Sequence, residues 1–156
     1  MDDEIELPPV GLILLMGVAA SGKSAFAARW FLRFEVVSSD ACRGMVSDDE
    51  ADQGATPDAF DLLRFIVSKR LARRRLTVVD ATNVRKSARE RLLDLARAYD
   101  TEAVAIVLDL PVEVCVLRDQ QRAVRRVGRA VILEQHRLLA LAMEQLSDEG
   151  FVAATR

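Results

Sequence analysis

The sequence predicts an α/β fold in which helices cover both faces of a parallel sheet. Short apolar runs alternate with amphipathic segments along all 156 residues, as expected for repeated strand–helix units. The run 104–108 is continuously apolar, which is typical of a parallel strand that is covered on both faces. No internal repeat or low-complexity segment interrupts this alternation, so we expect one domain over residues 1–156.

The composition narrows the classes of function. A hydrophobic content of 51% and a net charge of -2 indicate a sizeable core. The near-neutral charge argues against general adhesion to nucleic acid, so any polynucleotide contact must come from a local patch. Cys42 and Cys115 follow no secretory signal, which predicts small buried side chains in a reduced, cytoplasmic setting. The apolar runs are far shorter than the ~20 residues of a membrane span, so we expect no membrane contact.

The first strand and helix flank a phosphate-binding motif. After an acidic lead-in over 1–9, the apolar run 10–16 predicts a strand, and a helix is expected to extend to about Phe31. Between them, residues 17–24 have the pattern G-x-x-x-x-G-K-[ST]. In such a loop, glycine backbone wraps closely around a phosphate, and the helix N-terminus supplies positive potential.

Each position of this motif has an expected role. Gly17, Ser21 and Gly22 would shape the loop around the phosphates of a nucleotide. Lys23 would reach the β- and γ-phosphates, and the hydroxyl of Ser24 would hold Mg²⁺. The strand before the motif and the helix after it favour this interpretation over an ordinary glycine turn.

A second strand is predicted over 35–38, ending at Ser39-Asp40. Because ligands bind beyond the carboxyl ends of parallel strands, Asp40 is expected at the same edge of the sheet as the phosphate loop. A short helix over 40–46 and an acidic loop over 47–53 follow. We interpret that loop as solvated.

The middle of the chain continues the same alternation. Thr56-Pro57 predicts the start of a helix that ends in Arg73-Arg74-Arg75, whose charges would complement its C-terminus. A third strand over 76–80 ends at Asp80, where an acid could orient Mg²⁺ or its waters. A helix over 86–99, a strand over 101–110 and a helix opened by Pro111 complete this part.

Five arginines lie within twelve residues near the end of the chain, at positions 118, 122, 125, 126 and 129. In P-loop kinases such a segment forms a lid over the transferring phosphates, and we favour this interpretation over an exposed charged helix. The next helix is expected from about Ala130, with His136 as a core or rim residue. A fifth strand is expected over 150–154.

Taken together, the motifs resemble the 5′-hydroxyl polynucleotide kinases. The resemblance is closest to the N-terminal kinase module of the bacterial polynucleotide kinase-phosphatases, RNA-repair enzymes that also carry phosphatase and ligase modules. It covers nearly the whole chain and is carried by residues 17–24, 38–40, 42–43, 46–53, 79–83, Arg118 and Arg122.

The resemblance implies an adenylate-kinase-like P-loop NTPase with strand order 2-3-1-4-5 and a lid over 118–129. It further implies ATP or another NTP with Mg²⁺ as cofactors, and a 5′-hydroxyl end of RNA or DNA as the acceptor. Because the family continues beyond the last strand, the chain is expected to be an N-terminal module of a larger protein.

The family's functional residues can be carried over by position. Lys23 and Ser24 would bind ATP and Mg²⁺, with Asp80 acting on the metal through water. Asp40 would be the general base, and Arg43 and Gln53 would serve the acceptor. Arg118 and Arg122 would be the lid arginines that contact the nucleotide, whereas no role is assigned to Arg125, Arg126 or Arg129.

Two other interpretations of the function stay open. The chain could be a small-molecule P-loop kinase of the gluconate or adenylate type, or a nucleotide-dependent switch that only binds or hydrolyses ATP. Asp40 and Arg43 beside the phosphate loop argue against a pure switch, which does not require them. For the base, Asp80 is the rival of Asp40.

Overall fold

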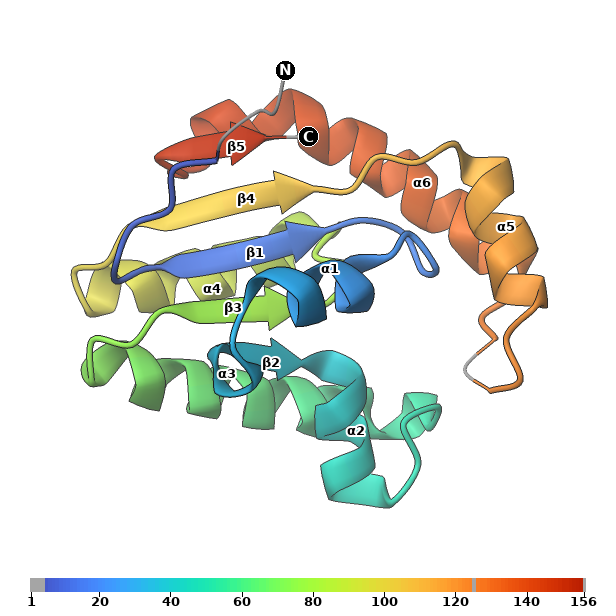
Figure 1. Cartoon of the computed structure of the whole chain (residues 1–156), viewed down its shortest axis with the longest axis horizontal. Helices are drawn as coiled ribbons and strands as arrows, with labels where there is room; N and C mark the ends of the chain where they lie inside the picture. Colours follow the sequence, from blue (N-terminus) through green and yellow to red (C-terminus); the bar gives the residue numbers. More distant parts are fainter. Residues whose placement is uncertain (1–4, 125, 156) are drawn as a thin grey trace.

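The computed structural model describes residues 5–124 and 126–155. Within them, one sheet of five parallel strands has the order β2-β3-β1-β4-β5 (Figure 1). The predicted order 2-3-1-4-5 is therefore confirmed. The strands are β1 (Leu12–Met16), β2 (Val36–Ser38), β3 (Thr77–Asp80), β4 (Ala103–Val107) and β5 (Ala153–Thr155).

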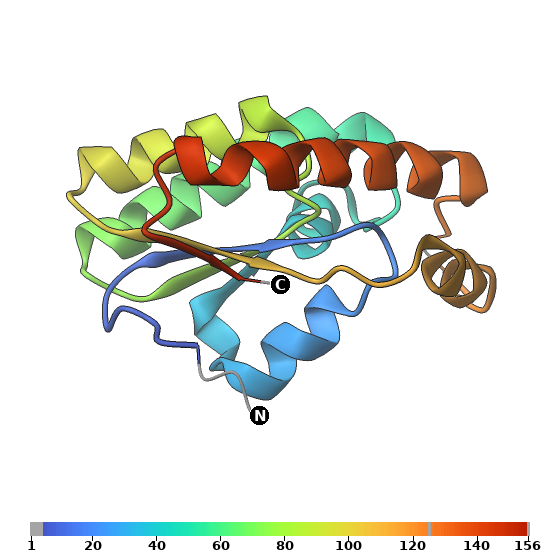
Figure 2. The ribbon, with the colours of Figure 1, turned by 90° about the horizontal axis from the view of Figure 1, so that it is seen from above.

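Helices cover both faces of this sheet. Figure 2 shows α1 (Lys23–Trp30) on one face and α3 (Thr56–Ala72), α4 (Lys86–Ala98) and α6 (Arg129–Gln145) on the other. The remaining elements are shorter: α2 (Ser39–Ser47), α5 (Val112–Gln120) and the 3₁₀ turns η1 (Arg33–Glu35), η2 (Gln53–Ala55) and η3 (Leu146–Asp148).

The central strand β1 explains the two-sided core. All five of its residues are fully buried. Leu12 and Leu14 pack into the cluster formed with α3 and α4, whereas Ile13 and Leu15 pack into the cluster that contains Ala27 of α1. Since successive side chains of a strand point to opposite faces, a continuous apolar run is what two covered faces require.

The register aligns the strand ends at one edge. Leu15 of β1 pairs with Asp80 at the end of β3, and Met16 pairs with Val107 at the end of β4. The loop after β1 therefore opens beside the last residue of β3.

The fifth strand was expected over 150–154 but is β5 at Ala153–Thr155, and one wrong boundary bears directly on the cleft. The second strand was expected to end at Ser39-Asp40, but β2 ends at Ser38, and Asp40 lies in the first turn of α2. The reason is a helix cap, because the Oγ of Ser38 accepts a hydrogen bond from the N–H of Ala41 at 3.2 Å. Asp40 still lies at the carboxyl edge of the sheet, but a helix rather than a strand orients it.

The arginine-dense segment also divides between elements. Arg118 belongs to α5 and Arg129 begins α6, and the described residues between the two helices, 121–124 and 126–128, lie in a loop. We call this loop the arginine loop. It carries Arg122 and Arg126, whereas Arg125 lies outside the described residues.

Several simpler expectations can be compared with the structure. Cys42 and Cys115 are buried and unbridged, and burial raises the pKa of both thiols. His136 is half-buried, as expected for a rim residue.

Arg74, expected to complement the end of α3, donates instead to the carbonyl of Tyr99 at 2.7 Å, across the turn after α4. Of the helices in the described ranges, none has the length and apolar character to cross a bilayer.

Candidate active site

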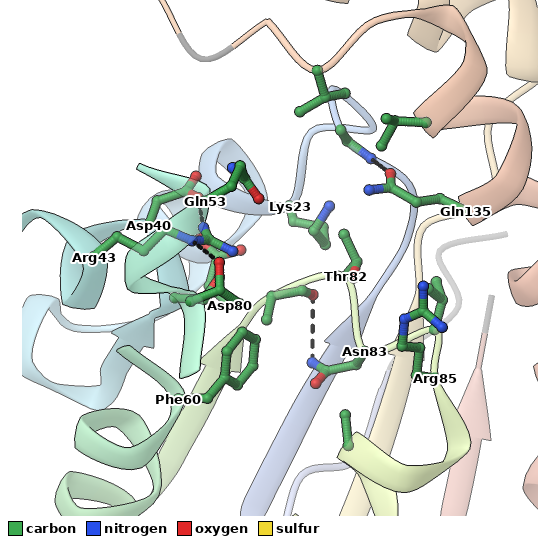
Figure 3. Close-up of a pocket in the computed structure, with 18 of the residues that line it drawn as sticks. Lys23, Asp40, Arg43, Gln53, Phe60, Asp80, Thr82, Asn83, Arg85 and Gln135 are labelled. Atoms are coloured by element: carbon green, nitrogen blue, oxygen red, sulfur yellow. Dashed lines mark hydrogen bonds and ion pairs between the residues drawn. The ribbon is translucent and has the colours of Figure 1, made fainter. Parts of the chain in front are cut away.

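A cleft of about 1230 Å³ opens at the carboxyl edge of the sheet. Segments that are far apart in the sequence line it, from the phosphate loop to α6. It brings together most of the predicted site residues: Gly22, Lys23, Ser24, Asp40, Arg43, Gln53, Asp80, Arg118 and Arg122. Figure 3 shows Asp40, Arg43 and Gln53 on one side of this cleft, Gln135 and Arg85 on the other, and Lys23 between them.

Gly17 and Ser21 shape the loop from beneath the cleft. A Cβ on Gly17 would lie 2.6 Å from the Oγ of Ser21 and 3.0 Å from the carbonyl oxygen of Leu108, so a side chain does not fit there. Gly22 has a φ of 93°, in the left-handed region that glycine adopts at low cost. It is also the N-cap of α1, and without a side chain it leaves the first amides of that helix to a ligand.

Lys23 is held over the phosphate loop by backbone carbonyls. Only 8% of the residue is exposed, and its Nζ donates to the carbonyls of Gly17 at 3.0 Å and Val18 at 2.8 Å. Burial lowers its pKa to about 8, against the opposing effect of Asp80 and with a smaller lowering from Arg122. The ammonium is therefore largely shielded from water, where its electrostatic attraction to a phosphate would be strong.

Ser24 and Asp80 form a pair of oxygen ligands beside this lysine. The Oγ of Ser24 donates to the Oδ2 of Asp80 at 2.7 Å, and Asp80 is only 7% exposed. Hard oxygen donors of this kind suit Mg²⁺, which keeps several waters and takes few ligands from the protein. Ser24 and Asp80 thus fit the expected metal. Among the described residues, no cluster of three or more acidic, histidine or cysteine side chains offers another metal site.

The opposite side of the cleft is built by an ion pair on α2. The Nη1 of Arg43 lies 2.7 Å from the Oδ1 of Asp40, one helical turn earlier. The Nε of Arg43 also donates to the Oγ1 of Thr56 at 3.1 Å, which joins α2 to the start of α3. Gln53, in η2, is exposed at the rim. A hydroxyl that enters between Lys23 and this pair would meet a carboxylate and a cation together.

The arginine side of the cleft is formed by the end of α5 and the arginine loop. Arg118, Arg122 and Arg126 line the cleft. The Nη1 of Arg118 lies 3.8 Å from the place where a Cβ on Gly22 would stand, so it reaches the phosphate loop. Arg129 does not line the cleft and forms a bidentate pair with Glu113, at 2.8 and 2.9 Å.

The lining is more basic than the protein as a whole. Eight lysine or arginine side chains and five aspartate or glutamate side chains face the cleft, in a chain whose net charge is -2. Positive charge is therefore concentrated where polyanionic ligands would bind.

Sequence reasoning missed Gln135 on α6. Its Oε1 accepts a hydrogen bond from the N–H of Ala19 at 2.8 Å, across 116 positions of sequence. The contact fixes the phosphate loop from outside the motif. No signal in the sequence indicates it, because a polar residue on an amphipathic helix does not reveal what it faces.

A second group, to which the sequence assigned no role, supports the chain segment after β3. Asn83 has a φ of 53° and is 3% exposed, and its Nδ2 donates to the carbonyl of Leu15 at 2.7 Å. Buried Arg89 donates to the carbonyls of Asn83 and Val84 and forms a bidentate pair with Glu149, at 2.6 and 2.8 Å. Asparagine is enriched at positive φ, which is the one local signal that could have marked this turn.

A family model described as an AAA domain matches residues 12–142. A search of curated protein sequences found no match.

Solved structures with the same fold include several kinases. A chain in the Pnkp1/Rnl/Hen1 RNA repair complex is 27% identical with a TM-score of 0.67, and the match covers 92% of this chain and 48% of that one. The APS kinase CysC of Mycobacterium tuberculosis, solved with AMPPNP and APS, is 20% identical with a TM-score of 0.56, covering 73% and 71%. A gluconokinase from Sinorhizobium meliloti is 21% identical with a TM-score of 0.55, covering 96% and 84%.

These likenesses show the fold of the P-loop kinases, a nucleotide-binding fold. This chain spans about half the length of the chain from the RNA repair complex that it matches.

Proposed function

The chain belongs to the AAA domain family, and we propose that it transfers the γ-phosphate of ATP to the 5′-hydroxyl end of a polynucleotide. The observation that carries this proposal is the Asp40–Arg43 pair in the same cleft as Lys23 and Ser24. A nucleotide switch needs a phosphate loop, whereas phosphoryl transfer to a hydroxyl also needs a carboxylate near the attacking oxygen.

The cleft supports a polynucleotide as the acceptor. Its excess of cationic side chains suits a ligand that carries several phosphates, and Gln53 and Arg43, which we assign to the acceptor, line the same cleft. The likeness to the RNA repair complex, at 27% identity, is higher than that to the gluconokinase at 21%. The acceptor assignment therefore rests on the site together with this likeness.

In the proposed reaction, each group acts on a stated atom. Lys23, Arg118 and Arg122 contact the phosphate oxygens, and Asp40 orients the 5′-hydroxyl and accepts its proton. Ser24 and Asp80 would hold Mg²⁺, with Asp80 acting through water, and the bound ion would neutralise charge on the β- and γ-phosphates. Arg43 keeps the Asp40 carboxylate in place and faces the acceptor.

We further propose that the kinase works within a larger RNA-repair protein that supplies phosphatase and ligase activities. Its support is the resemblance to the bacterial polynucleotide kinase-phosphatases together with the likeness to a chain of an RNA repair complex, of which the match covers 48%.

The test is a transfer assay with γ-labelled ATP and Mg²⁺. Matched RNA and DNA oligonucleotides with 5′-hydroxyl ends are offered in parallel with gluconate, adenylate and adenosine 5′-phosphosulfate. We expect label on the oligonucleotide ends and none on the small acceptors. Label on a small acceptor alone would replace the proposal with a small-molecule kinase, and label only in free phosphate would indicate a nucleotide hydrolase.

A further inference from the structure

Asp119 is a buried carboxylate that the proposed reaction does not use. It lies near the end of α5, directly after Arg118, and is only 2% exposed. Its Oδ1 accepts a hydrogen bond from the N–H of Val127, and its Oδ2 accepts one from the N–H of Gly128, each at 3.0 Å. One carboxylate thus binds two successive backbone amides eight and nine residues further along the chain.

These bonds close the arginine loop at its base. The backbone carbonyl of Asp119 also accepts the N–H of Arg122 at 3.1 Å, so the residue fixes the start of the loop as well as its end. Gly128 has a φ of 91° and is the N-cap of α6. The loop therefore turns into α6 at a residue whose backbone conformation is strained for other side chains.

Burying a carboxylate costs free energy, which other interactions must offset. Removing a charge from water costs several kcal/mol unless hydrogen bonds replace the water. Bonds from backbone N–H groups to an ionised acceptor are of the stronger, charge-assisted kind. An apolar residue could fill the same space but could not bind two amides, so the carboxylate specifies the conformation of the loop.

A second contact between the same helices is exposed. Arg129 and Glu113 pair in bidentate geometry, but more than half of each side chain is in solvent. Such exposed pairs contribute little. The buried carboxylate, not this pair, therefore holds the loop.

We propose that Asp119 is a positioning residue that holds the arginine loop in the shape that presents Arg118 and Arg122 to the transferring phosphate. This inference rests on the proposed phosphoryl transfer. Arg118 directly precedes Asp119, and Arg122 follows it by three residues. Loss of the two hydrogen bonds to the Asp119 carboxylate would therefore displace both arginines while leaving the phosphate loop intact.

The first test is a double-mutant cycle on the rate of transfer. Asp119→Asn keeps the size of the side chain but offers one acceptor oxygen instead of two. We expect kcat to fall by about 10²-fold, the cost of a misplacement of about 1 Å, with the KM for ATP nearly unchanged. In an Arg122→Ala background, Asp119→Asn should cost clearly less than it does in the wild type, because residues that act through one another are not additive. Losses that multiply in full would overturn the positioning role.

The matched control is Glu113→Ala, which breaks the exposed contact between the same two helices. We expect transfer at close to the wild-type rate. A loss as large as that of Asp119→Asn would show that any disturbance between α5 and α6 has this effect, and would also overturn the inference.

Amide hydrogen exchange tests the two hydrogen bonds of the Asp119 carboxylate in the absence of any phosphate-accepting substrate. In Asp119→Asn, the amides of Val127 and Gly128 should exchange faster, while the amides of β1 and β3 keep their protection. Unchanged exchange at both amides would contradict the positioning role of Asp119. Wild-type protein that phosphorylates no 5′-hydroxyl end would instead contradict the proposed function.

Discussion

The two sides of the cleft are held in place by different means. On the donor side, Lys23 is 8% exposed and is bonded to two backbone carbonyls of its own loop. On the side that we assign to the acceptor, 38% of the Asp40 side chain is exposed, and the Nη1 of Arg43 lies 2.7 Å from its Oδ1. The lysine is thus bonded to backbone, whereas the carboxylate is paired with a side chain.

This difference separates binding from transfer. A change on the donor side removes groups that contact the nucleotide before and during the reaction, so binding and transfer should fall together. A change on the acceptor side leaves the phosphate loop intact, so transfer should fall while nucleotide binding persists. Substitutions on the two sides should therefore differ in how they affect nucleotide binding and transfer.

Lys23→Ala should have the largest effect. Transfer is expected to fall to background, and nucleotide affinity to fall roughly ten- to a hundredfold, the value of about 1.5–3 kcal/mol for a hydrogen bond to a charged group. Calorimetry with Mg²⁺-ATP and the transfer assay measure the two losses. Lys69→Ala, on the exposed side of α3 outside the cleft, is the control and should match wild type. Substantial transfer by Lys23→Ala would contradict the donor-side assignment.

The two arginines of the proposed lid come next. Arg118→Ala and Arg122→Ala should each lower kcat by about 10³ to 10⁵, the range known for arginines that stabilise transferring phosphate. Arg122→Lys should rescue poorly, because lysine keeps the charge but loses the planar fork. The control is Arg129→Ala, which faces Glu113 outside the cleft and should retain activity. Full activity of Arg122→Lys would mean that only charge matters there.

Asp40→Asn tests the acceptor side directly. It preserves size but removes the proposed base, so transfer should fall by about 10² to 10⁴ while Mg²⁺-ATP affinity stays near wild type. Because the change also weakens the contact with Arg43, Arg43→Ala is measured beside it and should mainly raise the KM of the oligonucleotide. If Asp40→Asn transfers at the wild-type rate, Asp80 becomes the candidate base. If it loses ATP binding, Asp40 belongs to the metal site.

The same contrast separates what the sequence could and could not predict. The donor side follows from a local motif, and the strand order from apolar runs together with the family resemblance, so both were predicted. The position of Asp40 was predicted only in part, because the cap by Ser38 starts α2 before it. Gln135 and Asp119 were missed because each contacts backbone N–H groups, and backbone partners leave no mark on residue identity.

The titration of Lys23 predicts how nucleotide affinity depends on pH. Its pKa is lowered to about 8, so the ammonium is charged below that pH and loses its proton above it. Nucleotide affinity should therefore be highest below pH 8 and fall by up to about tenfold per pH unit above it. Lys23→Arg, which stays charged, should bind without this decline. A decline of the same slope in Lys23→Arg would assign the titration to another group.

Gln135→Met should have the smallest effect, and it tests whether the donor side depends on anything beyond its own backbone. The variant keeps the length of the side chain but removes the acceptor of the Ala19 N–H, which lies at 2.8 Å. A typical hydrogen bond contributes about 0.5–1.5 kcal/mol, so the KM for ATP should rise roughly two- to tenfold with kcat less affected. His136→Ala, next to it on α6 but outside the cleft, is the matched control and should leave the KM unchanged. An unchanged KM in Gln135→Met would mean that the phosphate loop needs no support from α6. A rise accompanied by an equal loss of kcat would instead show that the contact from Gln135 to the phosphate loop also matters in the transfer step.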